Sequence, residues 1–373
     1  MEQVYSFDEF SIPLWIKALF GGLYMVIFVY AAWKTLLKAP KDKRKVKVSA
    51  LFILLYFTAY AMFYCVNPDY FSYRDWVSAD LFDLATWTRE MVYAYIIIFC
   101  RLVNISYPFE LFRFIVWGGA LLLVSLTARL YRDILVPSLV LLFLFVFYSG
   151  TFSYARSSLA MAVYFLGVGI IMGEHHFFIK LLGLGLAICS YFFHHEMIIG
   201  IGILPSLIVP FEKKKTVLLS FLLLLMMIGA IVYINSNLAL VEAIFGDDEI
   251  SQKMETYNER GAGIFRISTF ISYFNIFYPF ILTTSYFFKR KHVPKTIAGM
   301  YRITLVLLLA TIAFSIVSGA RSTYTYRVLY IAIVPMAFLI AYCYTQGYIK
   351  KHQFAFMLML AVITNLMRLI QSV

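Results

Sequence analysis

Apolar stretches alternate with short polar connectors along most of the chain. These stretches run for 13 to 22 residues, and a helix that spans a bilayer needs about 20 apolar residues, with a range of about 17 to 25. The pattern predicts an all-α fold, a polytopic membrane helix bundle of about twelve transmembrane helices. The predicted spans are Ala18–Trp33, Ala50–Val66, Phe109–Leu126, Ile134–Tyr148, Ser157–Met172, Phe178–Phe193, Met197–Val209, Thr216–Ile234, Ile267–Phe288, Ile303–Val317, Val328–Tyr344 and Phe354–Leu369.

One further apolar segment, Met91–Val103, is shorter and is followed by polar residues and Pro108. We predict that this segment is interfacial or re-entrant. The connectors predict a single transmembrane domain over residues 1–373, with large outer loops at residues 67–90 and 235–266. The longest connector has about thirty residues, which is too short to form a soluble domain.

Composition supports a membrane protein, because 62% of the residues are hydrophobic and only 14% are charged. A soluble domain carries about 25% charged residues. The net charge of +12 could indicate a nucleic-acid partner, but the basic residues cluster in short connectors, such as residues 34–47, 213–215, 289–295 and 350–351. By the positive-inside rule this side of the bundle is cytoplasmic. We therefore expect the lipid bilayer as a partner, and no nucleic acid.

Motifs of cofactor chemistry are missing from the sequence. It contains no Gly-rich phosphate loop, no Walker motif and no HExxH. The four cysteines lie in or beside apolar runs and lack the spacing of metal ligands. This disfavours a nucleotide-driven pump or a zinc protease, and we predict no cofactor and no metal.

Residues 148–205 contain a first group of candidate residues. Two apolar spans are joined there by the short polar turn Gly173–His176. Arg156 opens the first span, and the sequence His194-His195-Glu196 closes the second. If both spans cross the membrane, the arginine and the histidines emerge at the same surface, which the basic connectors make the outer one.

Arg156 and His194 each allow two interpretations. An arginine at the end of a span can reach headgroup phosphates, or it can bind a lipid-linked phosphate or pyrophosphate through bidentate hydrogen bonds. A histidine near an interface is usually a satisfied amphipathic side chain. It also titrates near neutrality, so it can accept a proton from an attacking hydroxyl. His175 and His176 fall on the predicted cytoplasmic side, and we assign them no role.

Other candidate residues lie in the predicted outer loops. The first loop combines carboxylates with aromatic rings, including Asp69, Tyr73 and Asp75, a combination that suits the apolar faces and hydroxyl groups of sugars. For this loop alone, a solvated loop with its Trp and Tyr side chains among the headgroups is the simpler interpretation. Arginines are normally sparse on this side, and an anionic partner accounts for those found near the second loop and the late connector. They are Arg266, Arg321 and Arg327.

Four short motifs lie near the ends of the predicted spans or in the first outer loop. They are Arg156 with Ser157–Ala160, Phe193-His194 before Ile198–Pro205, Tyr326–Tyr330 running to Pro335, and Asp69-Tyr70 followed by Tyr73. These motifs are similar to those of the EpsG/Wzy-type family of bacterial polysaccharide polymerases. The chain differs from the usual family pattern at two positions. Ser157 follows Arg156 where the family often has glutamine, and Glu196 stands where it often has serine.

The resemblance implies a multi-pass glycosyltransferase of the bacterial plasma membrane whose active site faces the periplasm or the exterior. Such proteins polymerise oligosaccharide repeat units carried on undecaprenyl pyrophosphate into O-antigen, capsule or exopolysaccharide, and a chain-length regulator protein is an expected partner. In this reading His194, or Asp69 in its place, accepts the hydroxyl proton, while Arg156 and Arg327 hold the pyrophosphate. Substrate-binding roles are expected for Arg266, Arg321, His195, Asp75 and Tyr73.

Two alternatives remain open. A multispanning glycosyltransferase that uses a polyprenyl-monophosphate sugar commonly places an acidic base in its first outer loop, and Asp69 or Asp75 would qualify. A transporter or flippase of the lipid-linked oligosaccharide is expected to show repeat symmetry and charges near the bilayer centre. This sequence shows no internal repeat, and the charged residues with candidate roles lie in the loops or at the ends of the predicted spans.

Overall fold

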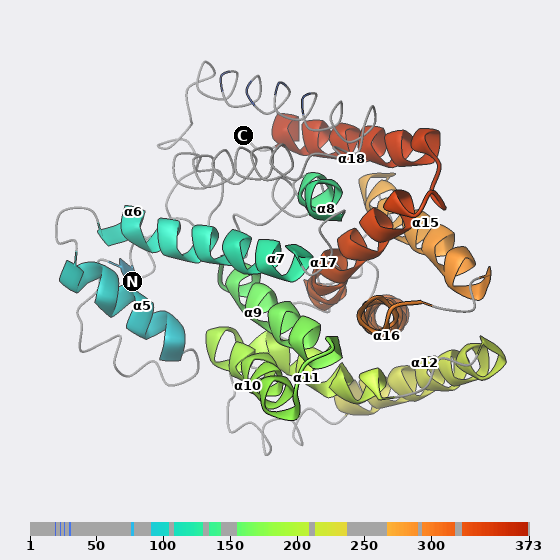
Figure 1. Ribbon diagram of the computed structural model, residues 1–373, viewed down its shortest axis with the longest axis horizontal. Coiled ribbons are helices and arrows are strands. Elements are labelled where there is room, and N and C mark those ends of the chain that lie inside the picture. The colour runs from blue at the N-terminus through green and yellow to red at the C-terminus, as the bar shows by residue number, and fades with distance from the viewer. Residues whose placement is uncertain are drawn as a thin grey trace. The chain divides into compact units, whose positions relative to one another are not determined.

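A computed structural model (Figure 1) describes the chain in separate ranges. The described residues are Leu19, Leu23, Val26, Tyr30, and residues 76–77, 91–103, 108–129, 134–142, 155–208, 213–236, 267–289, 293–317 and 323–371. Regular structure in these ranges is helical throughout, which confirms the predicted all-α class. The predicted span Ala50–Val66 lies outside the described residues, as do almost all of Ala18–Trp33 and of the two large outer loops.

Fifteen helical elements follow one another in the described ranges. They are α5 (Met91–Val103), α6 (Pro108–Arg113), the π-helical stretch η2 (Phe114–Gly118), α7 (Gly119–Arg129), α8 (Leu135–Leu142), α9 (Ala155–Met172), α10 (Phe177–Phe193), the 3₁₀ turn η5 (His195–Met197), α11 (Ile198–Ile203), the 3₁₀ turn η6 (Leu204–Leu207), α12 (Lys213–Ser236), α15 (Ile267–Lys289), α16 (Lys295–Val317), α17 (Thr323–Thr345) and α18 (Lys351–Gln371).

Two of the described helices are both long and apolar enough to cross a bilayer, Lys295–Val317 and Arg327–Thr345. The predicted number of about twelve spans is therefore not confirmed. Helix α5 has the predicted bounds, and its 13 residues make it shorter than a full span. The segment predicted as the span Met197–Val209 is a broken helix that changes from η5 to α11 to η6.

The contacts group the chain into two compact units. Unit 1 contains residues 1–171, 177–197 and 350–373, and unit 2 contains residues 172–176 and 198–349. The expectation of a single transmembrane domain stays a prediction.

In unit 1, α9 is buried along most of its length. Its side chains from Leu159 to Phe165 are buried, and so is Val168. The sequence of α9 is apolar on all sides after its first turn, and a helix of that kind is expected in a core. Helix α10 packs against α5 and the η5 turn, and its buried face consists of the small residues Gly183, Ala187 and Ser190.

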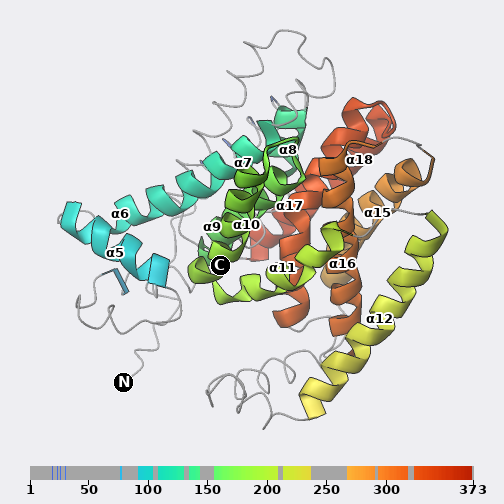
Figure 2. The same cartoon turned by 60° about the horizontal axis from the view of Figure 1, so that its bottom comes forward.

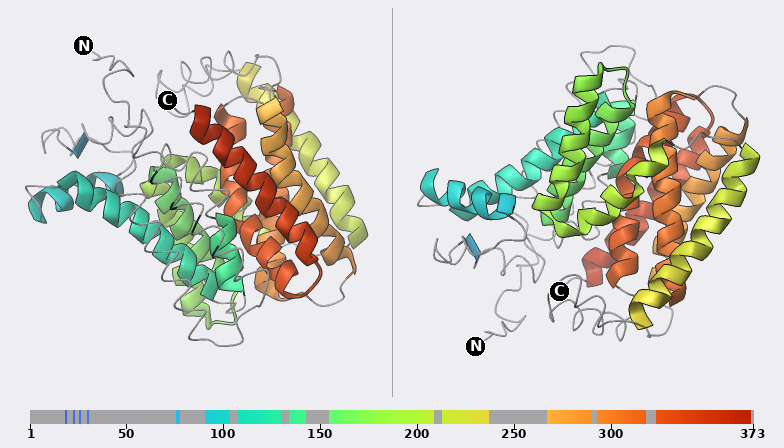
Figure 3. Two further views of the ribbon diagram at one scale, coloured as in Figure 1. Left: turned by 90° about the horizontal axis from the view of Figure 1, so that it is seen from above. Right: turned by 90° about the horizontal axis from the view of Figure 1, so that it is seen from below.

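In unit 2, α16 packs against α12, α17 and η6. Figures 2 and 3 show α12 beside α16, with both helices beginning at the same end of the unit. Helix α15 runs antiparallel to α16. Near one end the ring of Tyr301 stacks on Phe287, with centroids 4.3 Å apart, and near the other end the hydroxyl groups of Tyr273 and Ser315 lie 3.0 Å apart.

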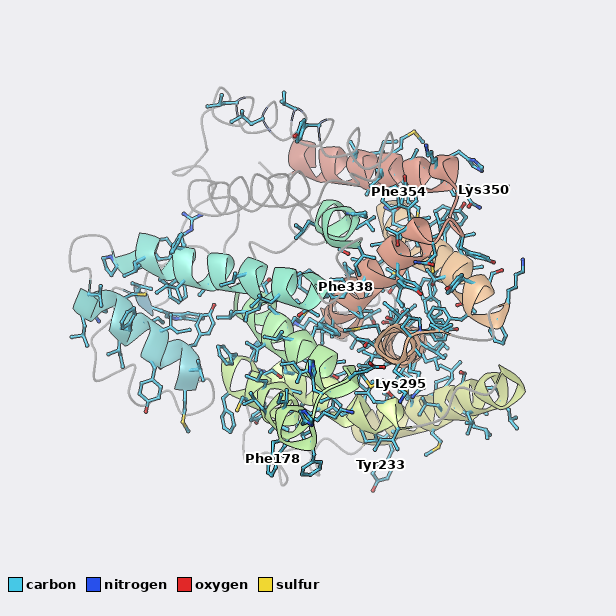
Figure 4. All side chains as sticks on the ribbon, in the orientation of Figure 1. Phe178, Tyr233, Lys295, Phe338, Lys350 and Phe354 are labelled. Carbon is cyan, nitrogen blue, oxygen red and sulfur yellow. The ribbon has the colours of Figure 1, made fainter. Side chains whose placement is uncertain are left out.

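Large apolar side chains are exposed on the outer faces of α10 and α12. Phe178 of α10 is 80% exposed and projects from the ribbon, whereas Phe338 of α17 is only 2% exposed (Figure 4). The exposed set on α10 recurs at helical spacing and includes Phe178, Leu181, Leu182, Ile188 and Phe192. A contiguous exposed face of large apolar side chains is typical of a surface in contact with lipid.

Candidate active site

The α9–α10 hairpin fixes the position of the first candidate residues. Only residues 173–176 separate the two helices, so they run antiparallel. They meet at glycines: a Cβ built on Gly167 would lie 2.5 Å from the carbonyl oxygen of Gly183, and one built on Gly183 would lie 2.9 Å from the oxygen of Gly167. Small residues of this kind let two helix backbones approach closely. The crossing therefore fixes the register of the hairpin.

This register places positions 156 and 194 at the same end of the hairpin. Arg156 precedes Gly167 by eleven residues, and His194 follows Gly183 by eleven residues. Both positions are therefore displaced from the crossing in the same direction by about 16 Å at 1.5 Å per residue. Eleven residues are close to three helical turns, so each position also falls on the helix face that carries its glycine. Positions 156 and 194 therefore lie at the same end of the hairpin in unit 1, and their emergence at one membrane surface stays a prediction.

His194 continues the buried stripe of α10. Gly183, Ala187, Ser190 and His194 follow one another at helical spacing, and all four are buried. The backbone N–H of His194 donates to the carbonyl of Ser190 at 3.1 Å, which extends the helical hydrogen-bond pattern of α10 to this residue. The imidazole is buried, unlike the side chains of the exposed apolar face of α10.

Glu196 contacts the His194 ring directly. The distance from His194 Nε2 to Glu196 Oε2 is 3.1 Å, and the two side chains are only 6% and 11% exposed. Residues two apart on an α-helix do not face each other. The pair forms because α10 ends at Phe193 and the chain changes to the 3₁₀ turn His195–Met197. The neighbouring His195 is exposed, and its ring packs edge-on against His194 with centroids 4.9 Å apart.

Arg327 belongs to unit 2 and lies at the opposite end of its helices from Lys289 and Lys295. It is in the second turn of α17 and is half-buried. Tyr342, 15 residues further along α17, packs against Tyr286 of α15, three residues before Lys289. Arg327 is therefore about 22 Å from the lysine end along the helix axis. Lys295 begins α16 at that same lysine end.

The comparison with protein families decides the identity of the chain. The sequence profile of the EpsG family matches residues 46–372. The chain belongs to the EpsG family. No curated protein and no solved structure gives a significant match. EpsG membership, together with the apolar helices, indicates a membrane protein with a polysaccharide polymerase-like, glycosyltransferase-type activity on lipid-linked oligosaccharide.

The remaining predicted site residues of this EpsG-family protein lie outside the described ranges. They are Asp69, Tyr73, Asp75, Arg266 and Arg321. For Arg156 the structure describes the backbone, in the first turn of α9. Of the predicted residues, position 156, His194 and His195 thus lie at the same end of the α9–α10 hairpin in unit 1. In the described ranges no group of three or more His, Cys, Asp or Glu side chains could hold a metal ion.

The interpretation of the sequence missed two residues. Glu196 was named only as a departure from the family pattern, yet it contacts His194. The sequence feature that could have indicated this contact is His-x-Glu directly after a helix.

Arg302, in α16, donates from an Nη nitrogen to the carbonyl oxygen of Leu207 at 2.5 Å. The predicted span began at Ile303 and therefore did not include Arg302. The helix in fact begins eight residues earlier, at Lys295, because residues 295–302 include good helix formers that a hydropathy criterion passes over.

Arg327 also differs from its predicted setting. It was expected in a connector before a span that begins at Val328, but α17 begins at Thr323. Threonine and tyrosine lower the hydropathy of residues 323–326 without preventing helix formation. Arg327 therefore belongs to a helix and not to a connecting loop.

Proposed function

We propose that this protein joins undecaprenyl-pyrophosphate-linked oligosaccharide repeat units by glycosyl transfer at the outer face of the bacterial plasma membrane. The observation that carries the proposal is the buried His194–Glu196 pair, at the same end of the α9–α10 hairpin as position 156. A base and a cation at one end of a hairpin are what this transfer needs. EpsG membership supplies the reaction class.

In the proposed reaction, a hydroxyl at the non-reducing end of one repeat unit attacks the anomeric carbon of the sugar linked to the other lipid. A new C–O bond forms as the bond from that carbon to the pyrophosphate oxygen breaks. His194 accepts the hydroxyl proton, and a general base of this kind contributes about 10²–10⁴-fold to the rate. The bonding electrons leave with undecaprenyl pyrophosphate.

Arginine is the proposed stabiliser of the leaving group. The guanidinium at position 156 binds pyrophosphate oxygens through paired hydrogen bonds, and Arg327 supplies a second cation. Arg266 and Arg321 are further candidates, and Asp69, Asp75, Tyr73 and His195 are proposed to contact the sugars. Loss of one preorganised donor to a developing charge typically costs about 10²–10³ in rate. Because the pyrophosphate already activates the donor, the reaction needs no nucleotide.

The distribution of charge within each unit supports the proposed orientation. In unit 1, Lys180 lies in the first turn of α10, at the end of the hairpin opposite His194. In unit 2, Lys289 and Lys295 lie at the end opposite Arg327. Lysines mark the cytoplasmic side under the positive-inside rule, so His194 and Arg327 are each assigned to the outer side.

The test is complementation of a deletion strain with variants, read as the length distribution of the polysaccharide. We expect Arg156→Ala, His194→Ala and Arg327→Ala to yield single repeat units in place of long chains. His176→Ala is the matched control, because His176 is an exposed histidine in the α9–α10 turn with no assigned role. It is expected to give polymer of normal length.

Normal long-chain polymer in all three variants contradicts the proposal. Two other phenotypes of the deletion strain contradict it in different ways. A polymer that lacks only one decorating sugar points to a monophosphate-dependent transferase, and accumulation of cytosol-facing lipid-linked units points to a flippase.

A further inference from the structure

We propose that Glu196 is a positioning residue that holds His194 in the tautomer with its proton on Nε2, so that Nδ1 is the nitrogen that accepts the substrate proton. The catalytic part of this inference rests on the proposed function. The tautomer itself does not, and it can be measured without any substrate.

The geometry of the pair determines which nitrogen is the donor. Glu196 Oε2 lies 3.1 Å from His194 Nε2, and an ionised carboxylate can only accept hydrogen bonds. Nε2 must therefore carry the proton in the contact. In a neutral imidazole the lone pair is then on Nδ1. When Nδ1 accepts a proton, the ring becomes an imidazolium, and the adjacent carboxylate stabilises its charge.

The backbone around His194 is fixed independently of this side-chain contact. The N–H of His194 donates to Ser190, and the N–H of Met197 donates to the carbonyl of His194 at 3.0 Å. These two hydrogen bonds close the end of α10 and the 3₁₀ turn without the Glu196 carboxylate. If Glu196 only helped to end the helix, it would not need to be acidic. We therefore assign its carboxylate the role of orienting the His194 ring.

Burial strengthens the contact. With 6% and 11% of their side chains exposed, the two groups are shielded from most of the solvent screening that weakens surface pairs. His194 also lies at the carboxyl end of α10, where the helix dipole favours a positive charge. A carboxylate and a helix end thus both stabilise the imidazolium that proton transfer creates.

The discriminating variant is Glu196→Gln. Its side chain keeps nearly the same shape, but an amide can either accept from or donate to Nε2, so it no longer imposes one tautomer. In Ser-His-Asp enzymes the corresponding change from carboxylate to amide lowers the rate by about 10⁴ through the wrong tautomer. For this protein we expect a fall of about 10²-fold or more in initial polymerisation rate.

The chain offers a matched control for this variant. Glu174 stands in the exposed turn beside His175 and His176, so Glu174→Gln makes the same chemical change next to two histidines at the other end of the hairpin. It is expected to leave the polymerisation rate and the His194 signals unchanged.

The experiment is ¹⁵N NMR of the histidine ring nitrogens in full-length protein in lipid nanodiscs. The signals of His194 are identified as those that disappear from the spectrum of His194→Ala. The wild type is expected to show the Nε2–H tautomer. Glu196→Gln is expected to show a mixture of the two tautomers or the Nδ1–H form alone. Its elution volume in size-exclusion chromatography is expected to match that of the wild type. An unchanged tautomer and an unchanged rate in Glu196→Gln would overturn the inference.

The two proposals fail in different ways. If His194→Ala polymerises normally, the proposed function is wrong, and the NMR signals still decide whether Glu196 sets the tautomer. If His194→Ala is inactive but Glu196→Gln keeps the wild-type rate and tautomer, only the role of Glu196 is wrong.

Discussion

The glycine crossing between α9 and α10 can be tested by adding side chains to it. A Cβ at Gly167 would lie 2.5 Å from the Gly183 carbonyl oxygen and 2.7 Å from the backbone nitrogen of Ala187. Both neighbours are backbone atoms, which no rotamer change can move. Gly167→Ala and Gly167→Leu should therefore force the two helices apart and disturb the register that sets positions 156 and 194 at one end.

The size of the effect follows from the overlap. Ordinary van der Waals contact begins at 3.4 Å, so one methyl group at Gly167 requires a separation of about 0.9 Å along that line. Overpacking of this kind costs about 1–3 kcal/mol, and the larger leucine side chain costs more. This outweighs the gain in helix propensity from Gly to Ala, which is at most about 1 kcal/mol.

Gly185 provides the control on the same helix pair, because nothing lies within 4 Å of a Cβ built there. Thermal unfolding of purified protein in detergent is the assay. We expect Gly167→Ala and Gly167→Leu to lower Tm progressively and to shorten the polysaccharide. Gly185→Ala should hold or raise Tm through its helix propensity. Equal Tm values for the Gly167 and Gly185 variants would refute the crossing as described.

Two further changes test unit 2. Arg302→Ala removes the donor to the Leu207 carbonyl, and a hydrogen bond to a charged group contributes about 1.5–3 kcal/mol to stability. We therefore expect a lower Tm and faster proteolysis near residues 198–208. A variant with the wild-type Tm and proteolysis rate would contradict the contact. Gly299→Ala places a methyl group 2.8 Å from Met172 Cε, but a methionine side chain can rotate aside. Its Tm should therefore fall less than that of Gly167→Ala, and a larger fall would show that the contact is rigid.

Much of the helical pattern is evident in the sequence. The predicted bounds of Ser157–Met172, Phe178–Phe193 and Ile267–Phe288 lie within two residues of the observed helices, because each apolar run ends at a polar turn. The prediction of one continuous helix across Pro279 is confirmed by α15. Proline is tolerated in membrane helices because neighbouring groups satisfy the freed backbone groups. Errors concentrate where polar residues continue a helix, as in α16 and α17.

The candidate site could be predicted only in part. The four-residue turn of the hairpin implies that Arg156 and His194 share one end, but the crossing at Gly167 and Gly183 that fixes their register is a packing fact. The contact between His194 and Glu196 was also beyond sequence reasoning. It depends on the helix ending one residue before His194, and helix ends are not set by hydrophobic periodicity.

The most direct test of the central claim is polymerisation by purified protein in nanodiscs, supplied with synthetic undecaprenyl-pyrophosphate-linked repeat units and read as a ladder on a gel. The wild-type protein and His176→Ala are predicted to build a ladder without added nucleotide, and His194→Ala is predicted to leave the substrate as single units. A normal ladder from folded His194→Ala, or no ladder from the wild type, would contradict the account.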